Sequence, residues 1–124
     1  MTEEVFITRP LPEPGVRLLE AAGLHTRVHP HDRPITGEEL LEGVATASAL
    51  LCMLTDRVDA HLLDRAPGLR VIANYAVGFD NIDVAEARRR GIEVTTTPDV
   101  LTEATADLTW ALLLAAARQL GAGE

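Results

Sequence analysis

The sequence predicts an α/β fold in which helices cover a five-stranded parallel sheet. Two observations lead to this prediction. Five short apolar or β-branched runs alternate with helical segments, and 124 residues, 47% of them apolar, suit one compact domain with a buried core. Five such units match a flavodoxin-like, doubly wound domain with the strand order 2-1-3-4-5.

The first half of the chain supplies three of the expected strands. They span Val5–Thr8, Thr26–Val28 and Ala49–Leu54. A helix from about Pro14 to Ala22 is expected to end at Gly23, because glycine tolerates the left-handed conformation that often follows a helix. Thr36 and Glu39 have the spacing of a capping box, which predicts the start of a second helix.

The second half supplies two strands and three helices. The strands are expected at Leu69–Ala73 and Ile92–Thr96. Asp59 begins a helix that Pro67-Gly68 stops, and Asp83 begins another that runs through Arg88–Arg90 to Gly91. The final helix is expected over Leu101–Leu120, with its cap near Thr102.

Composition excludes several classes of function. The chain has 19 acidic and 11 basic residues, so we expect neither a nucleic-acid nor a membrane partner. The longest apolar stretch, Leu108–Ala117, is about half of the roughly 20 residues that a membrane span needs, and it predicts a buried helix. The single Cys52 cannot form an intramolecular disulfide, and the acidic N-terminus does not resemble a secretory signal, so the expected location is the cytoplasm.

Loops at the carboxyl ends of the strands are the expected ligand sites of such a sheet. The loop Thr8–Pro12 contains two prolines, which argues against flavin binding there, and no glycine-rich dinucleotide or Walker A motif occurs. In the loop Asn74–Asp83, the amides of Ala76, Val77 and Gly78 can converge on a small carboxylate. The alternative is that Gly78 only permits the turn and Asp80 only caps the next helix.

Other reactive side chains carry weaker signals. The segment His29-Pro30-His31-Asp32 suggests metal ligands, but we expect a solvated loop and no metal site. Cys52 is expected to be a small buried side chain rather than a nucleophile. His25 and His61 are isolated, so neither is expected to act as a general acid.

Two longer motifs carry a family resemblance. The segments Ala73–Asp83 and Thr97–Asp107 closely resemble the N-terminal part of the D-2-hydroxyacid dehydrogenase family, nearest to its glyoxylate/hydroxypyruvate reductase branch. The resemblance runs from Val5 to about Leu120 and includes Val5–Arg9 and Leu54–Arg57. It implies a single substrate-binding domain over residues 1–124, which in the family is paired with a Rossmann cofactor domain.

The resemblance also implies residue roles. The amides of Val77 and Gly78, with Ala76 beside them, would hold the substrate carboxylate, and Leu54 would line the substrate pocket. On the cofactor side, Thr105 would face the phosphate side of the nicotinamide cofactor and Leu101 would lie near the nicotinamide. Asp80 would lie behind the substrate contacts and support them.

The catalytic Arg, His and Glu of the family, and its glycine-rich fingerprint, belong to the part of the enzyme that follows this segment. The resemblance therefore implies no catalytic residue and no bound cofactor in this chain, although the parent enzyme uses NAD(P)H to reduce a 2-oxo acid. The chain by itself is expected to be inactive and to bind a small 2-oxo acid weakly.

The helix over residues 101–120 has two expected arrangements. It either folds back over the sheet or is exchanged between two chains, and a homodimer through this helix is expected. A different class of function is also open, namely a stand-alone flavodoxin-like module for binding, folding or oligomerisation without an enzymatic role.

Overall fold

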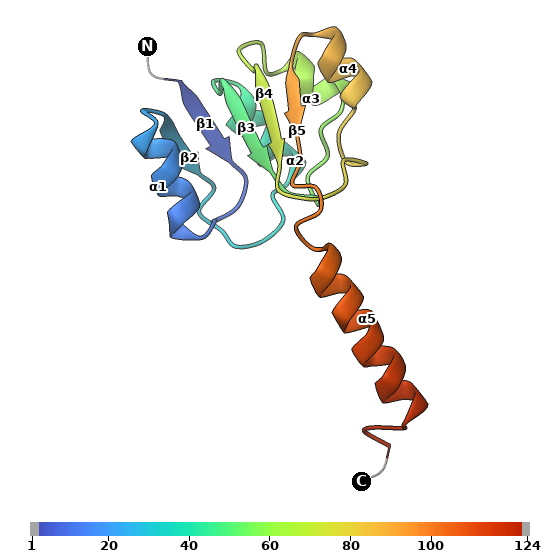
Figure 1. The fold of residues 1–124 in the computed structure, drawn as a ribbon. Helices are drawn as coiled ribbons and strands as arrows, with labels where there is room; N and C mark the ends of the chain where they lie inside the picture. Colours follow the sequence, from blue (N-terminus) through green and yellow to red (C-terminus); the bar gives the residue numbers. More distant parts are fainter. Residues whose placement is uncertain (1–2, 123–124) are drawn as a thin grey trace.

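The structure is a computed structural model that describes residues 3–122. It contains the predicted five-stranded sheet, with the order β2-β1-β3-β4-β5 and every neighbouring pair parallel (Figure 1). The strands are β1 (Glu4–Ile7), β2 (His25–Val28), β3 (Ala49–Cys52), β4 (Val71–Asn74) and β5 (Glu93–Thr95). The predicted fold class is therefore confirmed.

Five helices alternate with the strands. They are α1 (Glu13–Ala21), α2 (Gly37–Val44), α3 (Ala60–Asp64), α4 (Val84–Arg89) and α5 (Thr102–Ala117). Most begin where the sequence predicts, because local side chains satisfy their free amides. Thr36 and Glu39 form the capping box of α2, and the side chains of Asp59 and Asp83 cap α3 and α4.

Some predicted boundaries were wrong by one or two residues. The third strand ends at Cys52 rather than Leu54, because the Met53 N–H donates to the Asp56 side chain instead of continuing the ladder. The fourth strand begins at Val71, because Leu69 belongs to a turn in which its N–H donates to the Ala66 carbonyl. The N-cap of α5 is Leu101, which makes no side-chain capping bond, so the predicted cap near Thr102 is absent.

The core lies mainly on one face of the sheet. Phe6, Leu50 and Ile72 point from adjacent strands toward buried residues of α2, α3 and α4, and together they form one apolar cluster. Figure 1 shows α1 in front of β2, whereas α2 lies behind the sheet. Helices on both faces follow from right-handed crossovers between parallel strands.

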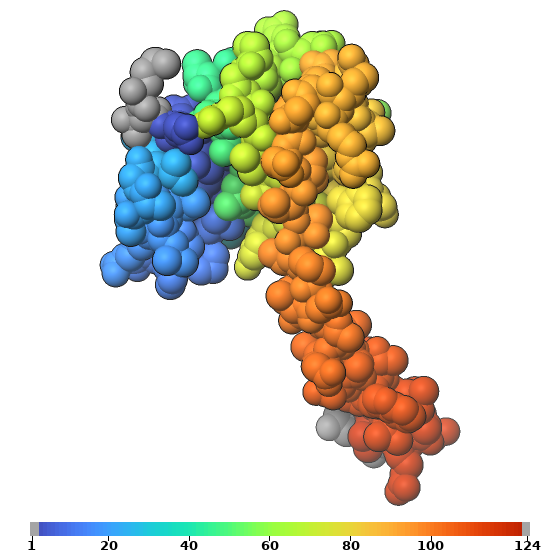
Figure 2. Space-filling model, turned by 45° about the horizontal axis from the view of Figure 1, so that its top comes forward, coloured from blue at the N-terminus to red at the C-terminus, as the bar shows by residue number. Residues whose placement is uncertain are grey.

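Helix α5 leaves the domain at the carboxyl end of the sheet. Figures 1 and 2 show it extending away from the sheet as an arm, and none of its residues is buried. In this structure the helix is therefore not folded back, and the expectation that the stretch is a buried helix does not hold. Among residues 3–122, no helix combines the length and apolar content needed to cross a membrane.

Candidate functional site

Two loops meet at the carboxyl edge of the sheet. One follows β3 and carries Leu54, and the other follows β4 and carries the glycine of the predicted anion site. They are joined by a parallel bridge in which the Val58 N–H donates to the Asn81 carbonyl over 2.9 Å and the Asp83 N–H donates to the Val58 carbonyl over 2.8 Å. The bridge holds the two loops in a fixed register.

The backbone of the β4 loop is pinned at its start. The Ala76 N–H donates to the Asn74 carbonyl over 2.8 Å, and the Ala76 carbonyl accepts from the Thr97 N–H over 2.9 Å. Neither the Val77 N–H nor the Gly78 N–H donates to any residue in the described part of the chain, 3–122. Adjacent backbone donors without an internal acceptor are available to bind an anion.

The structure also bears on the alternative interpretation of this loop. Gly78 has no positive φ, and a Cβ built on it would meet no heavy atom within 4 Å. The backbone conformation there does not require glycine, so permitting the turn does not explain the residue. The cap of the next helix is Asp83, not Asp80, because the Asp83 side chain accepts from the Glu86 N–H.

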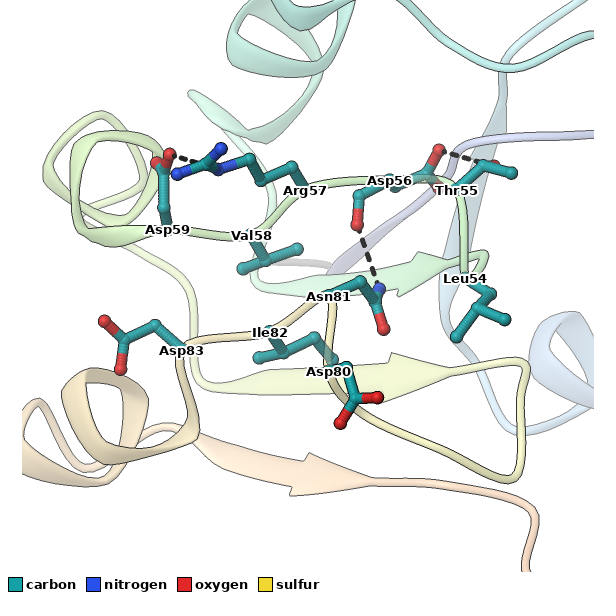
Figure 3. Close-up of a pocket in the computed structure, with 10 residues that line it drawn as sticks. All are labelled: Leu54, Thr55, Asp56, Arg57, Val58, Asp59, Asp80, Asn81, Ile82 and Asp83. Atoms are coloured by element: carbon teal, nitrogen blue, oxygen red, sulfur yellow. Dashed lines mark hydrogen bonds and ion pairs between the residues drawn. The ribbon is translucent and has the colours of Figure 1, made fainter.

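A hollow of about 460 Å³ separates the two loops (Figure 3). Leu54 and Asp80 both line it, which brings together two residues expected at the substrate side. Arg57 supplies its positive charge, and its Nε lies 3.1 Å from an oxygen of Asp59. No role for Arg57 was predicted from the sequence, although an arginine directly after a strand-end Thr-Asp pair offered the signal.

A second hollow, of about 600 Å³, lies where the β4 loop meets the first turns of α5. Val77, Leu101 and Thr105 all line it, together with Trp110. The structure thus gathers one of the three residues expected at the substrate carboxylate and both residues expected at the cofactor. Ala76 and Gly78 line neither hollow, and the β4 loop contributes to both, through Asp80 and Val77.

Hydrogen bonds from buried polar groups stabilise the β3 loop. The Thr8 hydroxyl donates to Asp56 Oδ2 over 2.5 Å, and the Met53 N–H donates to the same oxygen over 2.8 Å. Two asparagines, Asn74 and Asn81, link this loop to the β4 loop through their side-chain amides. Sequence reasoning missed these four polar side chains as supports, because only the fold brings them together.

The cysteine is buried and two of the histidines pack against each other. Burial raises the pKa of the Cys52 thiol to about 12, and the nearby Asp56 carboxylate contributes to the rise, so this thiol is not an activated nucleophile. The rings of His29 and His31 contact edge to face, with centroids 5.4 Å apart. No group of three or more potential metal-ligating side chains occurs among residues 3–122.

The sheet order and the two loops with their hollows at the carboxyl edge define a doubly wound α/β domain. The family model described as "D-isomer specific 2-hydroxyacid dehydrogenase, catalytic domain" matches residues 5–119. The chain belongs to this family.

Its similar relatives narrow the class further. The glyoxylate reductase of Thermococcus kodakarensis is 55% identical to this chain over 120 residues. That of Pyrococcus furiosus is 53% identical to it over 124 residues. These matches cover 97% and 100% of this chain but 36% and 37% of the relatives, so the chain spans little more than a third of their length.

Solved structures agree with this grouping. The TT0316 protein from Thermus thermophilus has a TM-score of 0.88 and 50% identity, over 97% of this chain and 38% of that one. An NADPH-dependent glyoxylate/hydroxypyruvate reductase from Sinorhizobium meliloti, solved with NADP and malonate, has a TM-score of 0.66 and 29% identity. That match covers 93% of this chain and 34% of the other.

Proposed function

We propose that this chain is the substrate-binding part of a glyoxylate reductase-type D-2-hydroxyacid dehydrogenase, which reduces a 2-oxo acid to a D-2-hydroxy acid with NAD(P)H. One observation carries the proposal: within residues 3–122, the adjacent amides of Val77 and Gly78 have no internal acceptor at the carboxyl end of β4. Two neighbouring N–H groups match the two oxygens of a carboxylate. Free space in front of Gly78 lets such a ligand approach the backbone.

The surroundings of the amides favour a small substrate. Leu54, which is 57% exposed, offers an apolar contact at the hollow between the two loops. Asp80 lines the same hollow, so a ligand with a second, distant negative charge would meet repulsion there. We propose a short 2-oxo acid such as glyoxylate as the ligand, bound weakly because one side of a cleft supplies few contacts.

The hollow beside α5 fits the cofactor side of the complete enzyme. Thr105 and Leu101 line it together with Val77, so the carboxylate site and this hollow share one wall. NAD(P)H would supply the hydride when bound. Hydride transfer requires the protein to hold cofactor and substrate together, so we propose that this chain alone neither retains the cofactor nor turns over glyoxylate.

The binding proposal is tested by following backbone amide resonances while oxalate, a glyoxylate analogue, is added up to tens of millimolar. We expect selective shifts at Val77 and Gly78. Gly78→Ala should fold normally, since its added Cβ meets no neighbour, but the methyl group should obstruct the anion and weaken the shifts. Gly15→Ala, on the exposed helix α1, is the matched control and should bind like the wild type.

Two outcomes would contradict this function. If oxalate causes no shifts at Val77 and Gly78 of the wild-type protein, the proposed anion site is ruled out. Oxidation of NADH or NADPH by the purified 124-residue chain with glyoxylate, above a heat-inactivated control, would contradict the proposed inactivity.

We place the protein in the cytoplasm on the ground that Cys52 is a free, buried thiol.

Helix α5 favours a second property, self-association into a homodimer. Residues 108–117 contain no charged side chain, and Trp110 and Leu114 are 64% and 56% exposed. An exposed apolar surface of this kind favours association. We propose the α5 helix of a second copy as the occupant, because it carries the same uncharged stretch and pairing buries no charge.

Sedimentation equilibrium tests the homodimer at micromolar concentrations. Wild type should sediment as a dimer, whereas Trp110→Glu and Leu114→Glu should sediment as monomers because each would bury a charge in the contact. Leu18→Glu on α1 is a matched control, since Leu18 is similarly exposed but lies far from α5 in the chain, and it should remain dimeric. A monomeric wild type would overturn the pairing.

A further inference from the structure

We propose that Asn74 and Asn81 are positioning residues that hold the carboxylate-binding loop in its binding geometry. This inference rests on the proposed function, because it concerns the loop that carries Val77 and Gly78. The side-chain amides of the two residues lie between the β3 and β4 loops. Neither asparagine is expected to touch the substrate.

The two amides bond reciprocally. Asn74 Nδ2 donates to Asn81 Oδ1 over 2.9 Å, and Asn81 Nδ2 donates to Asn74 Oδ1 over 3.2 Å. Asn74 is 2% exposed, so its polar atoms depend on protein partners rather than water. The pair is therefore a small, partly buried network with a defined orientation.

The second donor of Asn74 reaches the binding loop. Its Nδ2 donates to the Gly78 carbonyl over 2.9 Å. A peptide unit is planar, with C=O and N–H on opposite sides, so drawing the Gly78 carbonyl toward Asn74 turns the Phe79 N–H away from it. The Thr97 N–H fixes the Ala76 carbonyl in the same manner, which sets the direction of the Val77 N–H.

The two pinned peptides enclose the proposed anion site. The peptide between Val77 and Gly78 lies between them, so its N–H has little freedom to rotate. The Phe79 N–H, like its two predecessors, donates to no residue in the range 3–122. The N–H groups of Val77, Gly78 and Phe79 therefore have no internal acceptor. A hydrogen bond at each end of this segment restrains their peptide units.

Asn81 extends the same network to the other side of the hollow. Its Nδ2 donates to the Met53 carbonyl over 3.1 Å and to the Asp56 carbonyl over 2.9 Å. These carbonyls flank Leu54, the apolar contact proposed for the substrate. Figure 3 shows the Asn81 side chain directed at the segment that carries Asp56. The asparagine pair therefore adds to the backbone bridge at Val58 in fixing the relative position of the two loops.

Asparagine is required at position 74 because the site needs a donor and an acceptor on one short side chain. Oδ1 accepts from Asn81 and from the Cys52 thiol, which lies 3.4 Å away, while Nδ2 donates to Gly78. An ionised aspartate has the same shape but cannot donate. It would place a negative oxygen against the Gly78 carbonyl and release the loop.

Asn74→Asp tests this step with a pH-dependent readout. At pH 7.5 we expect altered Gly78 and Phe79 amide resonances, faster hydrogen exchange at Val77 to Phe79 and an apparent Kd for oxalate about five- to tenfold higher than wild type. Burial raises the pKa of a carboxyl group. Lowering the pH to about 5.5 should protonate part of the new aspartate, restore one donor and move the ligand-free resonances back toward the wild-type positions.

Asn81→Ala is the second variant, in case Asn74→Asp fails to fold. It keeps the bond from Asn74 to Gly78 but frees the Met53 and Asp56 carbonyls, so the largest resonance changes should move to residues 53–57. Val44→Ala is the matched control, because Val44 is fully buried in α2 and its truncation weakens the shared core without removing any hydrogen bond of either loop. It should lower stability and leave the Gly78 and Phe79 resonances unchanged.

The readouts separate this inference from the proposed function. Exchange and resonance positions are measured without ligand, so they judge the asparagine pair even if wild type binds no oxalate. Folded Asn74→Asp protein with wild-type exchange at Val77 to Phe79 would overturn the inference and leave the anion site intact. If the wild-type protein does not respond to oxalate, the anion-site proposal is contradicted. The loop measurements would still decide whether the asparagine pair holds the loop.

Discussion

Thr8 Oγ1 donates a hydrogen bond to Asp56 Oδ2 over 2.5 Å, and the two residues are only 1% and 3% exposed. The bond joins the end of β1 to the loop that follows β3. These strands are neighbours in the sheet, at the place where successive crossovers proceed in opposite directions. The polar contact therefore stabilises the β3 loop at the edge where the ligand is proposed to bind.

Replacing Thr8 with Val tests the value of this bond. The Asp56 carboxylate would lose a donor while remaining buried, so we expect the free energy of unfolding to fall by about 1–3 kcal/mol. Urea denaturation followed by circular dichroism measures the change. Thr26→Val is the control, because its hydroxyl also donates to a carboxylate, that of Glu20, but at an exposed position, and it should have little effect. An equal decrease in the free energy of unfolding of both variants would show that the buried bond stabilises the fold no more than the exposed one.

Gly43 in α2 is a second sensitive position. An added Cβ there would lie 2.1 Å from a ring carbon of Phe6, so either the ring or the helix must move. We expect Gly43→Ala to destabilise the fold by about 1–3 kcal/mol, as overpacking of a core typically does. Gly37→Ala in the same helix meets no neighbour and should be neutral or slightly stabilising. Chemical denaturation of the two variants side by side gives the comparison, and a Gly43→Ala protein as stable as wild type would contradict the packing argument.

Local signals explain why the fold could be predicted from the sequence. The capping box at Thr36 and the caps at Asp59 and Asp83 act within three residues, and the structure contains all three. The helix-ending glycines Gly23 and Gly91 have φ values of 83° and 72°, as their positions predict. Strand order was also predictable, because the alternation of strands and helices restricts the topology.

The environment of the site depends on contacts that a sequence pattern does not reveal. Thr8 and Asp56 are 48 residues apart, and Cys52 and Asn74 are 22 apart. Nothing in either local sequence signals such a partner. The position of α5 was missed for a related reason: an apolar run predicts that a helix will be covered, but it does not indicate which surface covers it. The roles of Leu54, Ala76, Val77, Gly78, Leu101 and Thr105 remain predictions from family resemblance.

Acid should weaken the ion pairs that Glu86 forms with Arg89 and Arg90 at the end of α4. Hydrogen bonds from Arg89 and Arg90 lower the pKa of Glu86 from an ordinary value of 4.5 to about 2, and Arg90 also bonds to Asp64 of α3 over 2.7 Å. A carboxyl group whose pKa is lowered by folding stabilises the folded state above its unfolded pKa, and this contribution is lost as the pH falls toward the folded pKa. The relevant window is therefore from about pH 4.5 down to about pH 2.

Thermal unfolding between pH 7 and pH 2.5 measures this contribution. Glu86→Gln should have a lower Tm than wild type at pH 7, and the difference should shrink as the pH falls through the window. Glu38→Gln is the control, because Glu38 forms no ion pair with any residue from 3 to 122, and its Tm should follow the wild-type curve. A difference between Glu86→Gln and wild type that stays constant with pH would contradict the assignment.

Cys52 should be unreactive in the folded protein and reactive once it unfolds. Burial is the main reason that its pKa rises to about 12, so at pH 8 almost none of the thiol is the nucleophilic thiolate. Because the side chain is also fully buried in β3, a reagent such as an aromatic disulfide can reach it only through an opening of the sheet. We expect negligible labelling over minutes in buffer and one equivalent of rapid labelling in 6 M guanidinium chloride, followed by absorbance. Since the chain contains a single cysteine, the signal reports on β3 alone. Immediate stoichiometric labelling of the folded protein would show that the central strands open readily and that Cys52 is not held in the core.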